Sequence, residues 1–327
     1  MSGMKRKERI DTALRFEQPD RPPHFEQLFE LSEEAFGAPL PGTAEFEGAP
    51  PSERGRLFER AASAYAKIVE EFEWDAVLVY PPAAPAPYAD PNHVAYEFIS
   101  YLKEYLRSHF GEPVPVGGFL WDSLICIDKI KDYVDFSVKL YEDRQRLVDW
   151  AESICAEGLL HAGRLISAGA DFVDVASDHA FNSGSFLSPA DFAQLVAPYM
   201  ARLTRYIQSR GAWVIMHTDG NIYGLMDQIL EIRPDVLQSI DPMAGMDIKE
   251  VKRLTYGKVA LMGNVQCSYL QDGPVEKVVE SGRYCLEHAA PGGGYIFSSS
   301  NTIFKGVPLQ NYRAMLSCLR EAYKGTY

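Results

Sequence analysis

The sequence predicts an α/β fold of the (β/α)8-barrel class. Eight short β-rich runs alternate with longer segments of helical periodicity, and this is the count that a closed parallel barrel requires. A doubly wound open sheet needs fewer strands and normally carries an early glycine-rich phosphate turn, but neither GxGxxG nor GxxxxGK[ST] occurs in the chain. With 327 residues, we expect a single barrel domain over residues 1–327, which includes an N-terminal helical lead-in.

The first half of the chain supplies three of the expected strands. They lie at 23–26, after an opening helix, at 76–80, after a helix over 57–73, and at 114–118, after a helix over 94–110. Each run follows a segment of helical periodicity, as the alternation of a parallel barrel requires.

The second half supplies the other five strands, at 172–176, 213–217, 236–240, 259–263 and 294–298. Ser188-Pro189-Ala190-Asp191 has the pattern of a helix start, with a Ser cap, Pro at the first helical position and an acid in the first turn. The apolar stripe from Phe192 to Tyr206 predicts the helix that follows. Further helices are expected over 221–232, from the Asp247–Glu250 capping box to Gly257, over 274–288 and over 308–324.

Two long connections and one glycine run interrupt this alternation. Residues 37–56 are rich in Gly, Pro and Glu, and residues 81–93 read PPAAPAPYADPNH. Connections of this length inside a compact domain are typical of lids and binding loops, so we expect them to shape substrate specificity. The run at 292–294 precedes a strand instead of opening a helix, and it predicts a tight turn on the face opposite the active site.

Composition narrows the class of protein. The formal net charge of −13 disfavours nucleic-acid binding, which relies on clustered Lys and Arg. The five cysteines are scattered and form no CxxC pair, so neither a zinc knuckle nor a disulfide framework is indicated. The sequence contains no run of about 18 apolar residues and no signal-peptide pattern at the N-terminus. We therefore expect a cytoplasmic protein that binds a small-molecule substrate and no membrane.

Barrel enzymes carry their chemistry in the loops that follow the strands, so polar residues at strand ends are the site candidates. We expect catalytic roles for four of them and substrate contacts for six others. The expected catalytic residues are Asp178, His179, His217 and Asp219, and the expected substrate-binding residues are Glu26, Tyr80, Trp121, Asn264, Ser299 and Asn301.

His217 is the strongest of these candidates. It directly follows the apolar run WVIM and precedes Asp-Gly, so the barrel places it at the mouth. Other strand-end residues fit two interpretations. Asp219 also has the position of a helix cap, the serine run near Ser299 also fits a turn that satisfies its own backbone, and Cys267 also fits a small buried apolar residue.

Five segments together resemble the uroporphyrinogen decarboxylase superfamily. They read ALRFEQPDRPP, SDHAFNSGSFLSPADFAQLVAPYM, GAWVIMHTDGNI, LMGNVQ and PGGGYIFSSSNTIFKGVPLQNYRAM, in this order, within a resemblance that runs from about residue 4 to 325. The resemblance implies the same (β/α)8 barrel and is closer to the corrinoid-linked methyltransferase branch. True decarboxylases carry arginines after the first strand that hold substrate carboxylates, whereas this chain reads RPPHFEQLFELSEEAFG there.

The zinc methyltransferases of this superfamily carry His-x-Cys at the end of the fifth strand and another Cys after the eighth. His217 matches their histidine, Asp219 stands in place of the first cysteine, and serines near Ser299 replace the second. The resemblance thus implies a zinc site built on His217 and Asp219 with one further ligand. The candidates for this ligand are Cys267, Glu26 and His179. We expect His217 and Cys267 to bind the metal. A site without metal fits the same residues.

The expected function is transfer of a methyl group from a small ether or amine to the corrinoid of a separate protein, with zinc assisting. One alternative is a cofactor-free decarboxylase or lyase acting on a carboxylated substrate, porphyrin-like or other. Another is a barrel that only binds a tetrapyrrole or corrinoid. Metal content separates the first two, and an absorbance shift with cobalamin without turnover favours the third.

Overall fold

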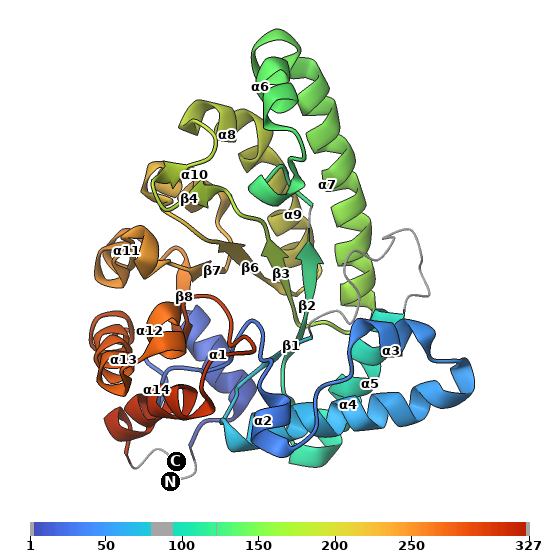
Figure 1. Ribbon diagram of the computed structural model, residues 1–327, viewed down its shortest axis with the longest axis vertical. Coiled ribbons are helices and arrows are strands. Elements are labelled where there is room, and N and C mark those ends of the chain that lie inside the picture. Colours follow the sequence, from blue (N-terminus) through green and yellow to red (C-terminus); the bar gives the residue numbers. More distant parts are fainter. Residues whose placement is uncertain (1–2, 80–93, 122, 325–327) are drawn as a thin grey trace.

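The computed structural model describes residues 3–79, 94–121 and 123–324. Within these residues, seven parallel strands form one curled sheet in the order β1-β2-β3-β6-β7-β8-β9 (Figure 1). This confirms the α/β fold with the parallel sheet that the sequence predicts. The strands are β1 Val77–Val79, β2 Val116–Trp121, β3 Phe172–Ala176, β6 Trp213–Thr218, β7 Val236–Ser239, β8 Ala260–Val265 and β9 Tyr295–Ser299; β4 Ala180–Phe181 and β5 Gly184–Ser185 form a separate antiparallel pair.

The segment expected as the first strand, residues 23–26, lies between the two edges of the sheet. Phe297 N donates to Pro23 O at 2.8 Å on the β9 side, and Asp75 N donates to His24 O at 2.7 Å next to β1. Its ladder contact is a single parallel bridge between His24 and Phe297. The segment is too irregular for a full strand because proline has no N–H to donate. It nevertheless brings β9 and β1 together around a common interior.

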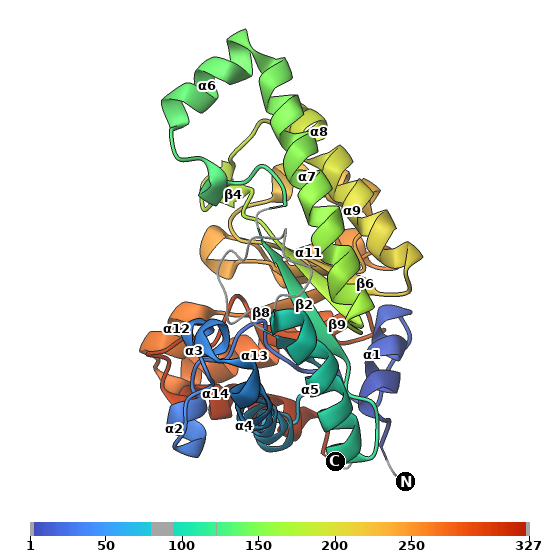
Figure 2. The ribbon, with the colours of Figure 1, turned by 90° about the vertical axis from the view of Figure 1, so that its right-hand side faces the viewer.

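The helices cover the outside of the curl, and α6 with the adjoining end of α7 extends beyond the sheet (Figures 1 and 2). In the part of the chain that the structure describes, no helix is long and apolar enough to cross a membrane. The helices are α1 Arg6–Leu14, α2 Ser32–Phe36, α3 Thr43–Gly48, α4 Pro51–Glu71, α5 Val94–Phe110, α6 Tyr133–Glu142, α7 Arg144–Ser167, α8 Pro189–Leu195, α9 Ala197–Ser209, α10 Met226–Ile232, α11 Ile248–Thr255, α12 Cys267–Asp272, α13 Val275–Ala289 and α14 Leu309–Ala322.

Two expectations about helices require correction. The single helix expected after Ser188 is two helices, α8 and α9, with Val196 between them. Pro198 explains the break, because it cannot donate the hydrogen bond that would continue the first helix. Residues 37–56, interpreted as one long loop, contain α3 and the start of α4, where Pro51 occupies the first turn. The other expected loop, 81–93, lies outside the described residues.

The glycine run at 292–294 forms the expected turn before β9. All three glycines have positive φ, and a Cβ on Gly293 would lie 2.1 Å from the carbonyl oxygen of Glu17. Only glycine fits such a close approach of two backbones.

Aromatic contacts across the curl identify its interior face. The ring of Phe25 lies 5.7 Å from Phe172 of β3 and 6.3 Å from Trp213 of β6, and the latter two rings stack at 4.1 Å. One step further along, Gln27 Nε2 donates to Asp174 Oδ2 at 3.0 Å. Residues 25 and 27 therefore face the interior, and because side chains alternate along an extended chain, residues 24 and 26 face the helices.

Candidate functional site

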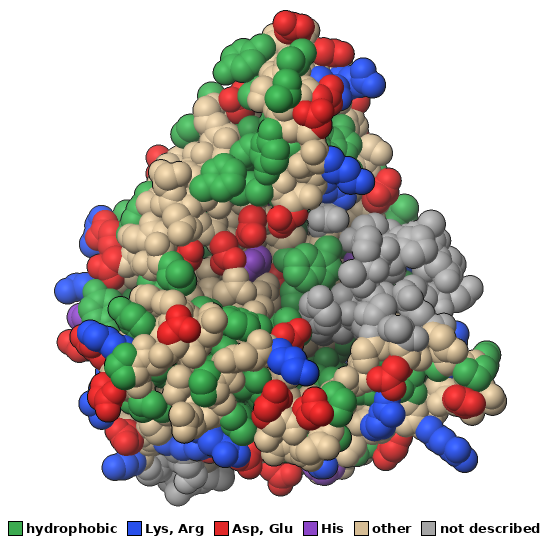
Figure 3. Space-filling model, viewed as in Figure 1, with side chains coloured by type: hydrophobic (Ala, Val, Ile, Leu, Met, Phe, Trp, Pro, Cys, Tyr) green, Lys and Arg blue, Asp and Glu red, His purple; other side chains and the backbone are tan. Residues whose placement is uncertain are grey.

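The candidate site is a group of three side chains at the carboxyl ends of β3 and β6. His217 lies in β6, and its backbone pairs with Ala176 of β3, two residues before Asp178. His217 Nε2 lies 3.7 Å from Asp178 Oδ1 and 4.0 Å from Asp219 Oδ2. Figure 3 shows acidic side chains around a histidine near the centre of one face of the molecule. The parallel sheet thus brings Asp178 and His217, which follow different strands, together at the end where barrel sites lie.

Gln238 of β7 fixes the orientation of the imidazole. Its Oε1 accepts a hydrogen bond from His217 Nδ1, and its Nε2 donates to the carbonyl oxygen of Asn301 at 3.3 Å. The donor bond to Asn301 determines which end of the amide faces the histidine, so the acceptor faces Nδ1. The neutral ring therefore carries its proton on Nδ1 and leaves the Nε2 lone pair directed at the two carboxylates.

The two carboxylates are held in turn by neighbouring loops. Asp178 Oδ1 accepts from the backbone N of Asp219 at 2.8 Å, and the side-chain amide of Asn301 donates to Asp219 Oδ2. Asn301 follows β9, so three separate loops at the carboxyl end of the sheet converge on this group. The side chains of Asp178 and Asp219 are 28% and 30% exposed, which leaves the group open to a ligand.

The balance of charges favours a protonated histidine. Burial disfavours the cationic ring, but the carboxylates of Asp219, Asp178 and Asp174 outweigh it and raise the pKa of His217 above its usual value. Burial also raises the pKa of Asp219, although His217 opposes this shift. His217 and Asp219 thus both have perturbed pKa values, which are common at functional sites.

Asp174, an interior residue of β3, has a carboxyl group with an incomplete set of partners. It is fully buried, Oδ2 accepts from Gln27, and Oδ1 has no hydrogen-bond partner among the described residues. Burial raises its pKa to about 6, although the charge of His217 lowers it in part. Sequence reasoning missed Asp174 and Gln238 because both lie within apolar strands and not in the loops after them.

The group has a donor set that a divalent metal can use. His217, Asp178 and Asp219 each offer one ligand atom, and these atoms lie within 4.8 Å of one another. Four ligands at the usual zinc distances stand about 3.3 Å apart, so closing the three atoms onto an ion needs only small side-chain movements. Gln238 on Nδ1 has the place of the outer hydrogen-bond partner that metal-binding histidines usually have. One imidazole and two carboxylates also suit other divalent ions.

Cys267 and His179 are not members of this group. Cys267 begins α12, where its Sγ lies 3.8 Å from Thr302 O, and burial raises its thiol pKa. His179 is buried against Phe192 of α8 with the ring centroids 5.3 Å apart, and burial lowers its pKa to about 4. The group of ligand atoms around His217 therefore includes Asp178 and neither Cys267 nor His179.

Glu26 and Ser299 contact each other outside the barrel interior. Glu26 is fully buried and accepts hydrogen bonds from the Ser299 hydroxyl at 2.7 Å and from its backbone N at 3.1 Å. His24, on the same face, contacts Tyr312 of α14 at 3.0 Å. The pair therefore faces the helix layer. Burial raises the pKa of Glu26 to about 8, which keeps the carboxyl protonated near neutral pH.

The remaining expected substrate contacts are dispersed. Asn264 donates to Ile240 O at 2.7 Å and accepts from Cys285 of α13 at 3.3 Å, which directs its side chain toward the helices. Trp121, at the end of β2, stacks on Phe119 at 5.0 Å. Asn301 does lie in the site, as a partner of Asp219. Tyr80 lies outside the described residues.

A parallel barrel with an acid–histidine group at the carboxyl ends of its strands defines an enzyme-like architecture, and comparison with known proteins gives the family. The uroporphyrinogen decarboxylase (URO-D) family model matches residues 82–322, so the chain belongs to this family. A solved methyltransferase from Methanosarcina mazei is 19% identical, with a TM-score of 0.73 over 98% of this chain and 99% of that one. This likeness shows the fold.

A second solved structure, the B12-independent methionine synthase from Shewanella sp. W3-18-1, is 16% identical, with a TM-score of 0.46 over 70% of this chain and 65% of that one. No curated protein matches the chain.

Proposed function

We propose that the protein is a methyltransferase that removes a methyl group from a small methylated ether or amine and delivers it to the corrinoid of a separate protein. The observation that carries the proposal is the Asp178–His217–Asp219 group with Gln238 on the far side of the imidazole. The family, and a fold shared with a protein named as a methyltransferase, support it.

The chemistry requires that charge be neutralised on the atom that loses its methyl group. When the carbon–heteroatom bond breaks, the heteroatom keeps the electron pair, so a nearby proton or cation lowers the barrier. Zinc held by His217, Asp178 and Asp219 would supply Lewis-acid chemistry. Gln238 keeps Nδ1 protonated and Nε2 available, and Asn301 orients the Asp219 carboxylate. Without zinc, the raised pKa of His217 makes the same ring a proton donor.

The test measures metal content and methyl transfer in the same preparations. Wild type, His217→Ala and the matched control His109→Ala, an exposed histidine on α5, are analysed for zinc by mass spectrometry. Each protein is then mixed with cob(I)alamin and a panel of methyl ethers and methylamines, and methylation is followed by absorbance. We expect stoichiometric zinc and transfer in wild type and His109→Ala, and loss of both in His217→Ala.

Full metal content and full activity in His217→Ala would contradict the site assignment. Zinc binding without methyl transfer to the corrinoid from any donor in the panel would contradict the proposed reaction but not the metal site.

A second candidate function is a cofactor-free decarboxylase or lyase. The observation that favours it is the cluster of acids that raises the pKa of the buried His217, because a protonated imidazole can deliver a proton to a carbanion formed by loss of carbon dioxide. Zinc-free protein that releases carbon dioxide from a carboxylated substrate, and loses this activity in His217→Ala, would favour this candidate over methyl transfer.

A further inference from the structure

A cavity of about 320 Å³ lies beside residues 28–32, which continue the irregular segment 23–26 that closes the barrel. We call residues 23–32 the irregular segment. On the β9 side this segment is well bonded, because Ile303 N donates to Leu28 O at 3.0 Å and Glu30 N donates to Ile303 O at 2.8 Å. On the β1 side, in the part of the chain that the structure describes, its main-chain bonding ends at Asp75 N to His24 O. The segment and β1 therefore separate beyond this point, and the space between them opens toward α4.

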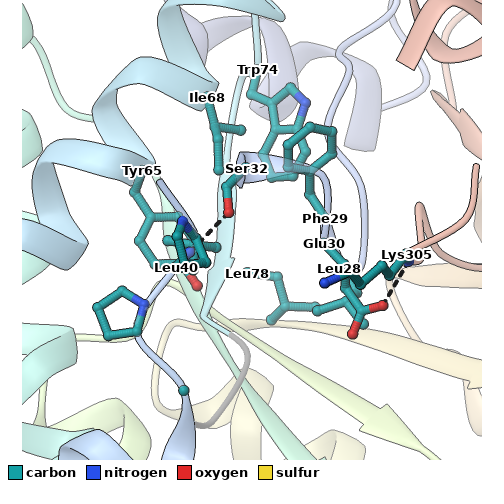
Figure 4. A pocket seen from close by; sticks show the side chains of 13 residues that line it. Leu28, Phe29, Glu30, Ser32, Leu40, Tyr65, Ile68, Trp74, Leu78 and Lys305 are labelled. Carbon is teal, nitrogen blue, oxygen red and sulfur yellow. Dashed lines mark hydrogen bonds between the residues drawn. The ribbon is translucent and has the colours of Figure 1, made fainter. Parts of the chain in front are cut away.

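The walls of the cavity are mainly apolar and aromatic. Phe29, Tyr65, Ile68, Trp74 and Leu78 line it, and each is at most 7% exposed (Figure 4). Three aromatic rings in one small cavity favour an aromatic ligand, because rings gain from edge and offset contacts beyond the area they bury.

One polar group inside the cavity lacks a partner for its hydrogen. Ser32 is 2% exposed, and its Oγ accepts a hydrogen bond from Leu40 N at 2.8 Å. Among the described residues, the hydroxyl hydrogen has no acceptor. A buried donor without an acceptor is costly, so a ligand that brings an acceptor gains that interaction. The charged residues Glu30 and Lys305 are exposed and lie at the rim (Figure 4).

We propose that this cavity binds a compact, uncharged aromatic molecule that carries one hydrogen-bond acceptor. An apolar cavity of about 150 Å³ is sufficient for benzene, so this cavity holds a ring with a substituent. A charged ligand is disfavoured because the buried walls offer it no ion partner. None of the lining residues belongs to the Asp178–His217–Asp219 group, and the site does not depend on the proposed methyl transfer.

Two probes of nearly equal shape test the proposal: anisole, which has an ether oxygen, and ethylbenzene, which has none. Methyl NMR follows Leu28, Leu40 and Leu78, which line the cavity. We expect both probes to shift these methyl signals and anisole to bind about five-fold more tightly, the effect of one net hydrogen bond. Ser32→Ala is expected to remove this preference.

Two substitutions at half-buried positions, Leu40→Trp and Leu28→Phe, fill the cavity from its edges. We expect each to abolish binding of both probes, whereas Leu160→Trp, at a 63% exposed position, is the matched control and leaves binding unchanged. His217→Ala is expected to retain binding, which separates this cavity from the candidate active site. Equal affinity for the two probes in wild type, or unchanged binding in both filled variants with native circular dichroism, would overturn the proposal.

Discussion

Replacement of Gln238 by leucine tests the central inference about the site, that an amide inside the barrel sets the protonation of His217. The substitution keeps the approximate size of the side chain and removes two interactions. His217 Nδ1 loses its acceptor, and Asn301 O loses its donor at 3.3 Å. Since Asn301 also donates to Asp219, the change disturbs two of the three proposed metal ligands without touching any of them.

The expected magnitude follows from these lost contacts. Outer partners of metal-binding histidines typically contribute 10–100-fold to metal affinity, which is about 1.4 to 2.7 kcal/mol. The substitution leaves the Nδ1–H of the buried His217 without an acceptor. We expect this unpaired donor to cost about 1–3 kcal/mol of folding stability as well. Gln238→Glu is expected to act in the opposite direction on affinity, because a carboxylate acceptor makes the ring a stronger donor to a metal.

Two measurements check this prediction. Zinc affinity is measured by competition with a chelator at fixed pH, and the His217 tautomer of the apo protein is assigned from ¹⁵N NMR shifts at a pH above the pKa of the ring, where the imidazole is neutral. Gln208→Leu, which removes a side-chain amide at an exposed site on α9, is the control. Wild-type affinity within two-fold in Gln238→Leu, together with an unchanged Nδ1–H tautomer, would refute the reasoning. The tautomer measurement remains informative whether or not the protein binds zinc.

Three further predictions concern stability. Burial raises the pKa of Glu26 from 4.5 to about 8, so the folded state holds an extra proton between these two pH values. The free energy of unfolding therefore falls as pH rises through this window. Glu26→Gln should flatten the corresponding fall in urea midpoints between about pH 5 and 8. Asp75 is fully buried and pairs with Arg9 at 2.5 Å and with Arg21 at 2.7 Å, so Asp75→Ala should cost about 3–5 kcal/mol of unfolding free energy in denaturant. The control Asp11→Ala breaks an exposed pair with Lys7 within a helix and should cost less than about 0.5 kcal/mol. Equal costs for the two variants would contradict the argument. Gly293→Ala should lower the melting temperature more than Gly211→Ala. Both glycines have positive φ, but of these two positions only Gly293 would place a Cβ against a backbone oxygen. Similar shifts in melting temperature for the two variants would show that this close approach is unimportant.

The succession of elements could be predicted from the sequence with good accuracy. The expected strand over 172–176 and the expected helix over 94–110 coincide with β3 and α5. Short apolar runs and helical periodicity are local signals, so they can be found without knowing what packs against them. The break at Pro198 is not predicted, because the apolar stripe continues across it. The helices within 37–56 are not predicted either, because the Gly, Pro and Glu content of this segment is typical of a loop.

The inward or outward direction of strand residues could not be predicted. Barrel strands are buried on both faces, by the interior on one side and the helices on the other, so apolar alternation does not distinguish the two. Glu26 and Asn264 therefore looked like residues of the mouth, although their partners place them toward the helix layer. Gln238 and Asp174, which do face the interior, had no loop position to mark them.

The sequence alone determined that short parallel strands would alternate with helices and that His217 would stand at a strand end, because these depend on neighbours along the chain. The sequence also names Asp178 and Asp219 as partners of His217, but only the tertiary structure shows that these two carboxylates lie beside the ring while Cys267 and His179 do not, and that Gln238 contacts its far side. These contacts join separate strands and loops, and their distances depend on how the sheet curls. Such a distance is a property of the whole barrel and of no local segment.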